Sequence, residues 1–242
     1  MKRMFMLYGC LMLGQLGTAQ SVSRDFITQY LVWFRYYNKL AVSPMWQVQT
    51  ELEVRQYVSP VRLHQGVFRI NALRQLKVGP SVGGGATLFL QTLPQTAEEE
   101  VDRLRPEIRP HQELNLSQPM GKLMLNHRYK VEERFFTQTA VEPAEFAVRF
   151  RYKLELQIPL TPTEEPYLLL LRVYDEIMVS AGPAVVNNVF DQNRLYASLQ
   201  VSLSKHWAAE MAYMHWLQQR PSGAEFYNRH IARMTLTHSL SL

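Results

Sequence analysis

Charged side chains occupy alternate positions along several segments of this 242-residue sequence, and this spacing suits an ion-pair network. From Arg149 to Glu155 every second residue is charged, and the residues between them, such as Phe150, are apolar or aromatic. Successive side chains of a β-strand point to opposite faces, so these charges would share one face. Similar spacing elsewhere predicts a lumen charge network. Its predicted members are Glu51, Glu53, Arg55, Glu113, Arg128, Lys130, Glu132, Arg134, Arg149, Arg151, Lys153, Glu155, Arg172, Glu176, Arg194 and Arg233.

Two functions are open for such a charged face. Arg and Glu on neighbouring strands can neutralise each other through charge-assisted hydrogen bonds, and long side chains can fill a narrow barrel. In that case the network is structural. Alternatively, the excess of Arg forms the wall of a polar path that attracts anions.

Catalysis by a nucleophile would need a serine beside a base, and the sequence offers seven histidines for that role. They are His64, His111, His127, His206, His215, His230 and His238. A Ser–His pair like that of an outer-membrane phospholipase is conceivable, but no G-x-S-x-G motif marks it. His215 shares its alternation with Met211 and Tyr213, which favours a lipid-facing or interface position. We therefore predict no catalytic residue.

Metal, cofactor and nucleic-acid partners have little support. Cys10, the only cysteine, lies in the leader, so the mature chain lacks thiolate ligands. The acidic run Glu98–Glu100 could hold a divalent cation, but oxygen-ligand spacing is not evident and such runs usually mark solvated loops. The net charge of +5 is spread singly among opposing glutamates and forms no basic block. We expect no metal, no cofactor and no nucleic acid.

The elements that would position these charges are amphipathic strands. The segment Glu145–Pro159 has one wholly apolar face and one charged or polar face, which is typical of a transmembrane β-barrel. Eleven segments alternate in this way. Bacterial barrels normally have an even strand number, so a further strand is expected near Ser21–Thr28. The predicted fold is all-β, an antiparallel up-and-down transmembrane β-barrel of about ten to twelve strands, with twelve favoured.

Links and aromatic residues complete this expectation. Short links at Ala41–Pro44, Pro119–Lys122 and Ser204–His206 are predicted to be periplasmic, and longer ones external. The run Gly83–Gly85 is expected to form a turn or bulge. The tryptophans are expected to form girdles at the membrane interface. They are Trp33, Trp46, Trp207 and Trp216.

The first residues carry the pattern of a secretory signal peptide. Lys2 and Arg3 precede an apolar run from Met4 to Leu16, and Ala19 supplies a small residue for cleavage. We predict that residues 1–19 are a signal peptide and that residues 20–242 form a single outer-membrane β-barrel domain. Outer-membrane lipid is then the expected partner, while a small-molecule ligand and the oligomeric state stay open.

Several segments, in their order along the chain, resemble an uncharacterised Gram-negative outer-membrane β-barrel family known only as a domain of unknown function. They are WFRYYNKLAVSPMWQVQTELEVRQY, HRYKVEERFF, VRFRYKLELQIPL, YDEIM and DQNRLYASLQVSLSKHWAAEMAYMHW. The resemblance spans nearly the whole mature chain. It implies a fold and a location, and it brings no catalytic residues.

These observations favour an outer-membrane barrel with a charge-filled lumen and a structural or passive-transport role. A phospholipase-like, lipid-modifying enzyme and a soluble periplasmic lipocalin-like binder are the alternatives. The assignment of faces also predicts that Phe150→Arg, on the lipid side, destabilises the barrel more than Arg151→Gln in the lumen.

Overall fold

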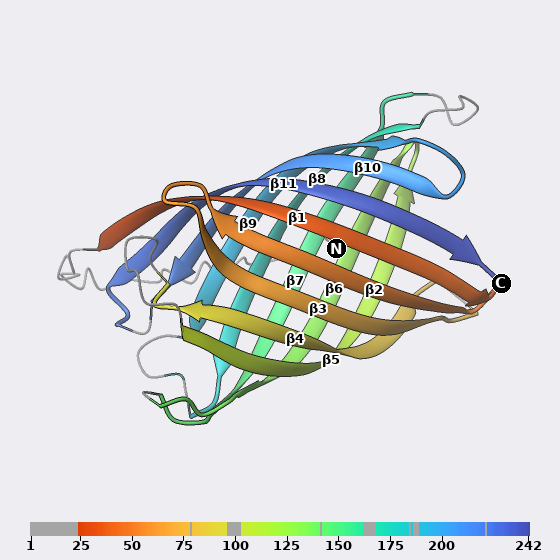
Figure 1. Ribbon diagram of the computed structural model, residues 1–242. Coiled ribbons are helices and arrows are strands. Elements are labelled where there is room, and N and C mark those ends of the chain that lie inside the picture. The colour runs from red at the N-terminus through yellow and green to blue at the C-terminus, as the bar shows by residue number, and fades with distance from the viewer. Residues whose placement is uncertain are drawn as a thin grey trace, which may run out of the picture.

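A computed structural model of the protein describes residues 24–77, 79–95, 103–140, 142–161, 168–183, 185, 189–220 and 222–242, and these residues form a closed β-barrel (Figure 1). Within these ranges there are eleven strands and no helix. The strands are β1 (Asp25–Ser43), β2 (Trp46–Tyr57), β3 (Arg62–Gln75), β4 (Ser81–Leu93), β5 (Arg103–Met120), β6 (Leu123–Phe136), β7 (Glu145–Pro159), β8 (Leu169–Ala181), β9 (Phe190–Ser202), β10 (Trp207–Gln219) and β11 (Glu225–Ser241).

Alternation along each strand decides which side chains face the interior. On β7, Phe150 is 48% exposed, whereas the preceding Arg149 is only 3% exposed. The same contrast separates Leu52 from Glu51 and Glu53 on β2. The apolar face of the sheet therefore points outward and the charged face inward, which is the reverse of a soluble barrel.

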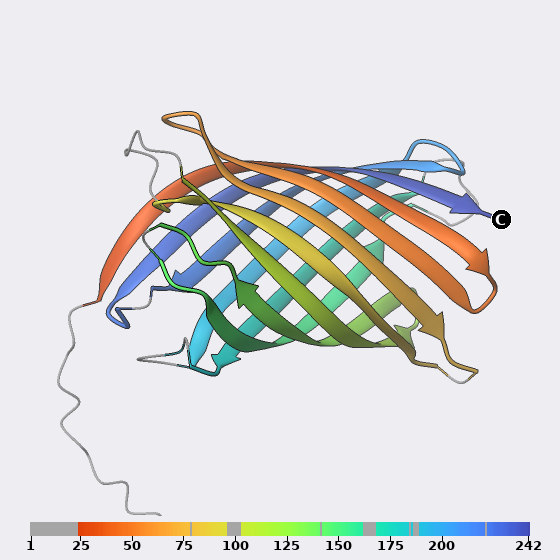
Figure 2. The ribbon, with the colours of Figure 1, turned by 60° about the horizontal axis from the view of Figure 1, so that its bottom comes forward.

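The barrel closes between its first and last strands. Neighbouring strands pair antiparallel, except that β1 and β11 pair in parallel, from Asp25↔Glu225 to Ala41↔Ser241. Because the strand number is odd, β1 begins at one end of the barrel and β11 finishes at the other (Figure 2). Closure gives hydrogen-bond partners to both edge strands, so no edge is left open.

The expected all-β barrel of about ten to twelve strands is confirmed, with two differences. The favoured count of twelve exceeds the eleven strands of the described residues, because Asp25–Thr28 is the start of the 19-residue strand β1 and not part of a separate strand. The purely antiparallel topology also needs correction at the β1–β11 pair. A parallel closing pair is what allows an odd number of up-and-down strands to form a closed barrel.

The two ends of the barrel differ in their links. Residues 44–45, 121–122 and 203–206 form the links β1–β2, β5–β6 and β9–β10 at the end where the chain terminates, called here the short-link end (Figure 2). At the opposite, long-link end, β4 and β5 are separated in the sequence by residues 94–102, β6 and β7 by residues 137–144, and β8 and β9 by residues 182–189. One longer separation, residues 160–168 between β7 and β8, departs from this pattern, because these two strands are joined at the short-link end.

The run Gly83–Gly85 lies inside β4 with continuous pairing to β3 and β5, so the expected turn or bulge is wrong. A Cβ atom on Gly85 would overlap the backbone oxygen of Ile70, and one on Gly83 would overlap the side chain of Leu73. These glycines therefore permit a close approach of β4 to β3.

The predicted signal peptide (residues 1–19) and the acidic run Glu98–Glu100 lie outside the described residues. In the portion of the chain that the structure does describe, no helix has the length and hydropathy needed to cross a membrane.

Candidate functional site in the barrel interior

The structure places all predicted members of the lumen charge network on the inward face of the barrel, and none of them is an exposed residue. They come from strands on all sides of the interior: β2, β5, β6, β7, β8, β9 and β11. The strand twist and closure bring these side chains together, although they are far apart in the sequence. The arrangement includes three groups of ion pairs.

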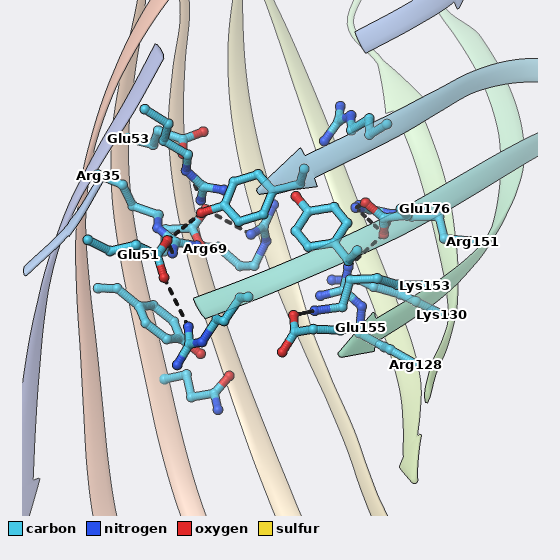
Figure 3. Close-up of a pocket in the computed structure, with 18 of the residues that line it drawn as sticks. Arg35, Glu51, Glu53, Arg69, Arg128, Lys130, Arg151, Lys153, Glu155 and Glu176 are labelled. Carbon is cyan, nitrogen blue, oxygen red and sulfur yellow. Dashed lines mark hydrogen bonds and ion pairs between the residues drawn. The ribbon is translucent and has the colours of Figure 1, made fainter. Parts of the chain in front are cut away.

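The first group centres on Arg151 of β7, which lies between two glutamates of the neighbouring strands. Its Nη1 atom is 2.6 Å from Oε1 of Glu132, and its Nη2 atom is 2.8 Å from Oε1 of Glu176. Arg128 contacts the same carboxylate of Glu176 at 2.6 Å (Figure 3). The side chains of Glu132 and Glu176 are only 1% and 2% exposed. Their charges therefore depend on these arginines for compensation.

The second group bridges the parallel seam. Arg233 of β11 donates toward Glu53 of β2 at 3.1 Å, so this ion pair spans β1. Next to it, Glu51 accepts from Arg69 at 2.8 Å and from Arg35 of β1 at 3.4 Å. The seam is thus held by side-chain charges as well as by backbone hydrogen bonds.

The third group lies toward the long-link end. Both Arg109 and Arg134 donate to Glu107 of β5, with Nε to Oε1 distances of 2.5 Å and 2.6 Å. Arg149 pairs with Asp191 at 2.5 Å. This group fixes β5, β6, β7 and β9 to one another across the lumen.

Sequence reasoning missed several interior charges. They are Arg35, Arg69, Glu107, Arg109, Asp191 and Glu210. Glu107 was missed because the strand predicted in this part of the chain begins at Ile108, whereas β5 begins at Arg103. The alternation of Arg105, Glu107 and Arg109 was the signal that could have found this segment. Glu210 was overlooked as a single acidic residue in an apolar stretch.

An apolar wall faces these charges from β1, β10 and β11. Trp33 and Trp216 are 1% and 3% exposed and meet edge to face, with ring centroids 5.8 Å apart. The guanidinium of Arg55 lies 3.8 Å from the Trp33 ring centroid, and that of Arg229 lies 4.4 Å from the Trp216 ring centroid. The expectation of interface girdles is therefore wrong for these two tryptophans, which share their strand faces with interior charges such as Arg35.

The described residues enclose two cavities inside the barrel. The larger, of about 290 Å³, is lined by residues near the short-link ends of their strands, such as Lys39, Gln49 and Arg172. The smaller, of about 80 Å³, lies toward the long-link end. Arg55 and Arg194 line both cavities and so lie between them.

The histidines form no catalytic arrangement with serine. His127 is 2.9 Å from the Tyr152 hydroxyl, and the Nε2 atom of His215 is 2.6 Å from Oδ1 of Asn228. The buried rings of His64 and His111 have no hydrogen-bond partner within the described residues. Across the same residues, no serine hydroxyl bonds to a histidine ring, and no group of three or more His, Cys, Asp or Glu side chains could hold a metal ion.

The fold and the interior define the class: a closed β-barrel with an apolar exterior and an ion-paired interior. The model of a family described as protein of unknown function (DUF2490) matches residues 31–227. The chain therefore belongs to this family, and the resemblance found in the sequence is confirmed.

A comparison with solved structures shows a similarity of fold. The chain is similar to the crystal structure of the beta domain of the Bordetella autotransporter Brka, with 7% sequence identity and a TM-score of 0.44. This similarity covers 73% of the present chain and 79% of the other. A search of the curated proteins finds no match.

Proposed function

We propose that this protein is a structural outer-membrane β-barrel whose lumen is filled by ion pairs. It reaches the periplasm through a cleaved signal peptide and then inserts into outer-membrane lipid. The observation that carries this proposal is a band of exposed apolar side chains around the outside of the barrel. It includes Phe26, Phe34, Leu52, Phe68, Ile70, Leu88, Ile108, Phe150, Ile177, Leu195, Leu199, Met211 and Met234.

This outer band argues against the soluble periplasmic binder. Soluble proteins rarely expose contiguous apolar patches larger than a few hundred Å². Here the exposed apolar residues recur on every strand from β1 to β11, so water would face them around the whole barrel. A bilayer removes the free-energy cost of exposing apolar side chains to water, because lipid tails are as apolar as the side chains that they would cover.

The enzyme alternative has no comparable support. A nucleophile and its base need to lie within hydrogen-bond reach of each other. The Nδ1 atom of the His206 ring contacts the backbone oxygen of Ser239, and that of the His230 ring contacts the hydroxyl of Tyr213. No observation in the described residues favours acyl transfer or lipid hydrolysis.

Membrane fractionation tests the proposed location. The mature protein is expected to stay in the outer-membrane fraction after washes with high salt and alkaline carbonate, and to need detergent for release. The outer band of residues such as Phe34, Phe68 and Phe150 is the reason, since neither wash weakens apolar contact with lipid. A soluble periplasmic protein of the same cells serves as the control. Release of the barrel by carbonate alone would overturn the proposal.

The filled lumen is expected to conduct little or no steady current in planar bilayers. Interior Arg and Glu side chains from β2 to β11 pair with one another. Arg55, whose guanidinium lies over the Trp33 ring, lies between the two cavities. Narrow barrels filled by side chains leave no continuous water column. Insertion is verified independently by the heat-dependent shift of the folded barrel in gel electrophoresis. Large, stable channels with anion preference would refute the closed lumen and favour a pore.

A further inference from the structure

We propose that the larger cavity is a binding site for a small, multiply charged oxyanion that carries phosphate or carboxylate groups. The inference goes beyond the proposed function, because it needs the barrel and its interior but not the membrane location. Three features of the cavity support it: its charge balance, its unpaired donors and its position at one end of the barrel.

The charge balance of the lining is strongly positive. Among the described residues that line the larger cavity, eleven are Arg or Lys and six are Glu. The glutamates are already engaged: Glu155 pairs with Lys153 at 2.6 Å, and Glu210 pairs with Arg172 at 3.1 Å. The excess of cations faces an enclosed space, where uncompensated charge is costly. A bound anion of several negative charges would supply the missing compensation.

Two cations of the lining have no carboxylate partner. Lys39 and Arg194 form no ion pair with any described residue, and both line the larger cavity. Arg194 donates to Oε1 of Gln192 at 3.1 Å and stacks near Trp216, but its Nε atom has no acceptor among the described residues. The buried Nε atoms of Arg172 and Arg233 are equally without an acceptor there. Such N–H groups are suited to phosphate and carboxylate oxygens.

The cations surround the cavity from opposite walls. Figure 3 shows Glu51 and Arg69 on one side, and Lys153 and Glu155 on the other. The rings of Tyr174 and Tyr196, which stack with their centroids 4.4 Å apart, also line the cavity. A ligand here would be enclosed by charge on both sides. The volume of about 290 Å³ lies at the lower limit of ligand pockets, which indicates a small molecule.

The cavity lies toward the short-link end of the barrel. Lys39 and Gln157 of its lining lie within a few residues of that end of β1 and β7. Toward the long-link end, the Trp33 and Trp216 pair fills one side of the interior. There the chain after β4 also turns inward, because the backbone oxygen of Gln95 accepts from Gln29 of β1 at 2.9 Å. If the short links are periplasmic, as the sequence predicts, the cavity lies on the periplasmic side of the barrel.

Calorimetric titration of the purified, detergent-solubilised barrel with diphosphate tests the site. Saturable binding is expected at fixed ionic strength, with chloride replacing diphosphate in the blank. Lys39→Gln and Arg194→Gln are each expected to weaken binding roughly tenfold to a hundredfold, because each removes a charge-assisted hydrogen bond. Citrate in a second titration separates a preference for carboxylates from one for phosphates, and saturable binding of either with the same variant pattern supports the site.

Lys205→Gln is the matched control, since Lys205 is exposed in the link β9–β10 at the same end and the change removes the same charge. It is expected to bind as the wild type does. Absence of saturable binding of both probes to wild-type protein, or equal weakening by Lys205→Gln and Lys39→Gln, would overturn the proposal. The heat-dependent gel shift shows that each variant is folded. A failed titration leaves the fractionation result untouched, so the two proposals fail separately.

Discussion

Arg151→Gln is expected to lower the free energy of unfolding of the barrel by about 3 to 5 kcal/mol, the range for breaking a buried ion pair. Arg151 is the cation nearest to Glu132, at 2.6 Å, and it makes three further hydrogen bonds to Glu176. The other cations around Glu132, which include Arg149 and Lys130, lie at 3.9 Å. Glutamine cannot replace the guanidinium charge, so two buried carboxylates lose compensation. Urea unfolding in detergent micelles, followed by tryptophan fluorescence, measures the effect.

A triple variant separates charge compensation from packing. When Arg151→Met is combined with Glu132→Leu and Glu176→Leu, no carboxylate of the group is left unpaired, and much of the lost stability is expected to return. Arg128 then loses its partner Glu176, which limits the recovery. Wild-type stability of Arg151→Gln alone would show that this ion-pair group does not hold the barrel together.

This expected loss is larger than the sequence suggests. Alternation indicates that Arg151 faces the lumen, where Arg151→Gln is predicted to cost less than Phe150→Arg on the lipid side. The structure puts its guanidinium between two carboxylates that are nearly inaccessible to water. Which strand face a residue occupies follows from local spacing, but which partners it meets depends on the register of β6, β7 and β8. That register is set by the whole barrel and cannot be read from one strand.

The same distinction explains the other successes and errors. The faces of β2 and β7 were predictable, because apolar residues alternate with charged or polar ones over most of both segments. The interior position of Trp33 was not, because an aromatic residue suits a membrane interface and an interior wall equally well by type. Trp33 and Arg35 are two positions apart, so they lie on the same face of the strand. This spacing indicates an interior position for Trp33 only when the charged face is known to point inward.

The way in which the barrel closes was harder to predict from the sequence than the strand faces. The count of alternating segments gave eleven, and only the general preference for even numbers favoured twelve. The parallel pairing of β1 with β11 joins residues about two hundred positions apart, such as Thr28 and Asn228, and leaves no local mark in either segment. A closing contact of this kind depends on the curvature that all strands build up together.

Phe150→Arg tests whether the outer band meets lipid. Phe150 is 48% exposed on the outside of β7, away from the ends of this strand. A charge near the bilayer midplane is expected to destabilise the barrel by about 2 to 4 kcal/mol, and one near the interface by about 0 to 1 kcal/mol. Phe146→Arg is therefore the matched control, because Phe146 lies on the same face of the same strand but beside its end. Urea unfolding of both variants in lipid vesicles gives the comparison.

The relative stability of the two variants distinguishes a lipid-facing exterior from a water-facing one. If lipid surrounds the barrel, depth decides the cost, and Phe150→Arg is the more harmful although the chemical change is the same. If water surrounded it, both residues would be exposed aromatics, and arginine would be tolerated at either position within about 0.5 kcal/mol. Equal and small effects would therefore contradict a membrane-spanning exterior. A much larger loss of stability for Phe150→Arg than for Phe146→Arg would support contact of the outer strand face with lipid.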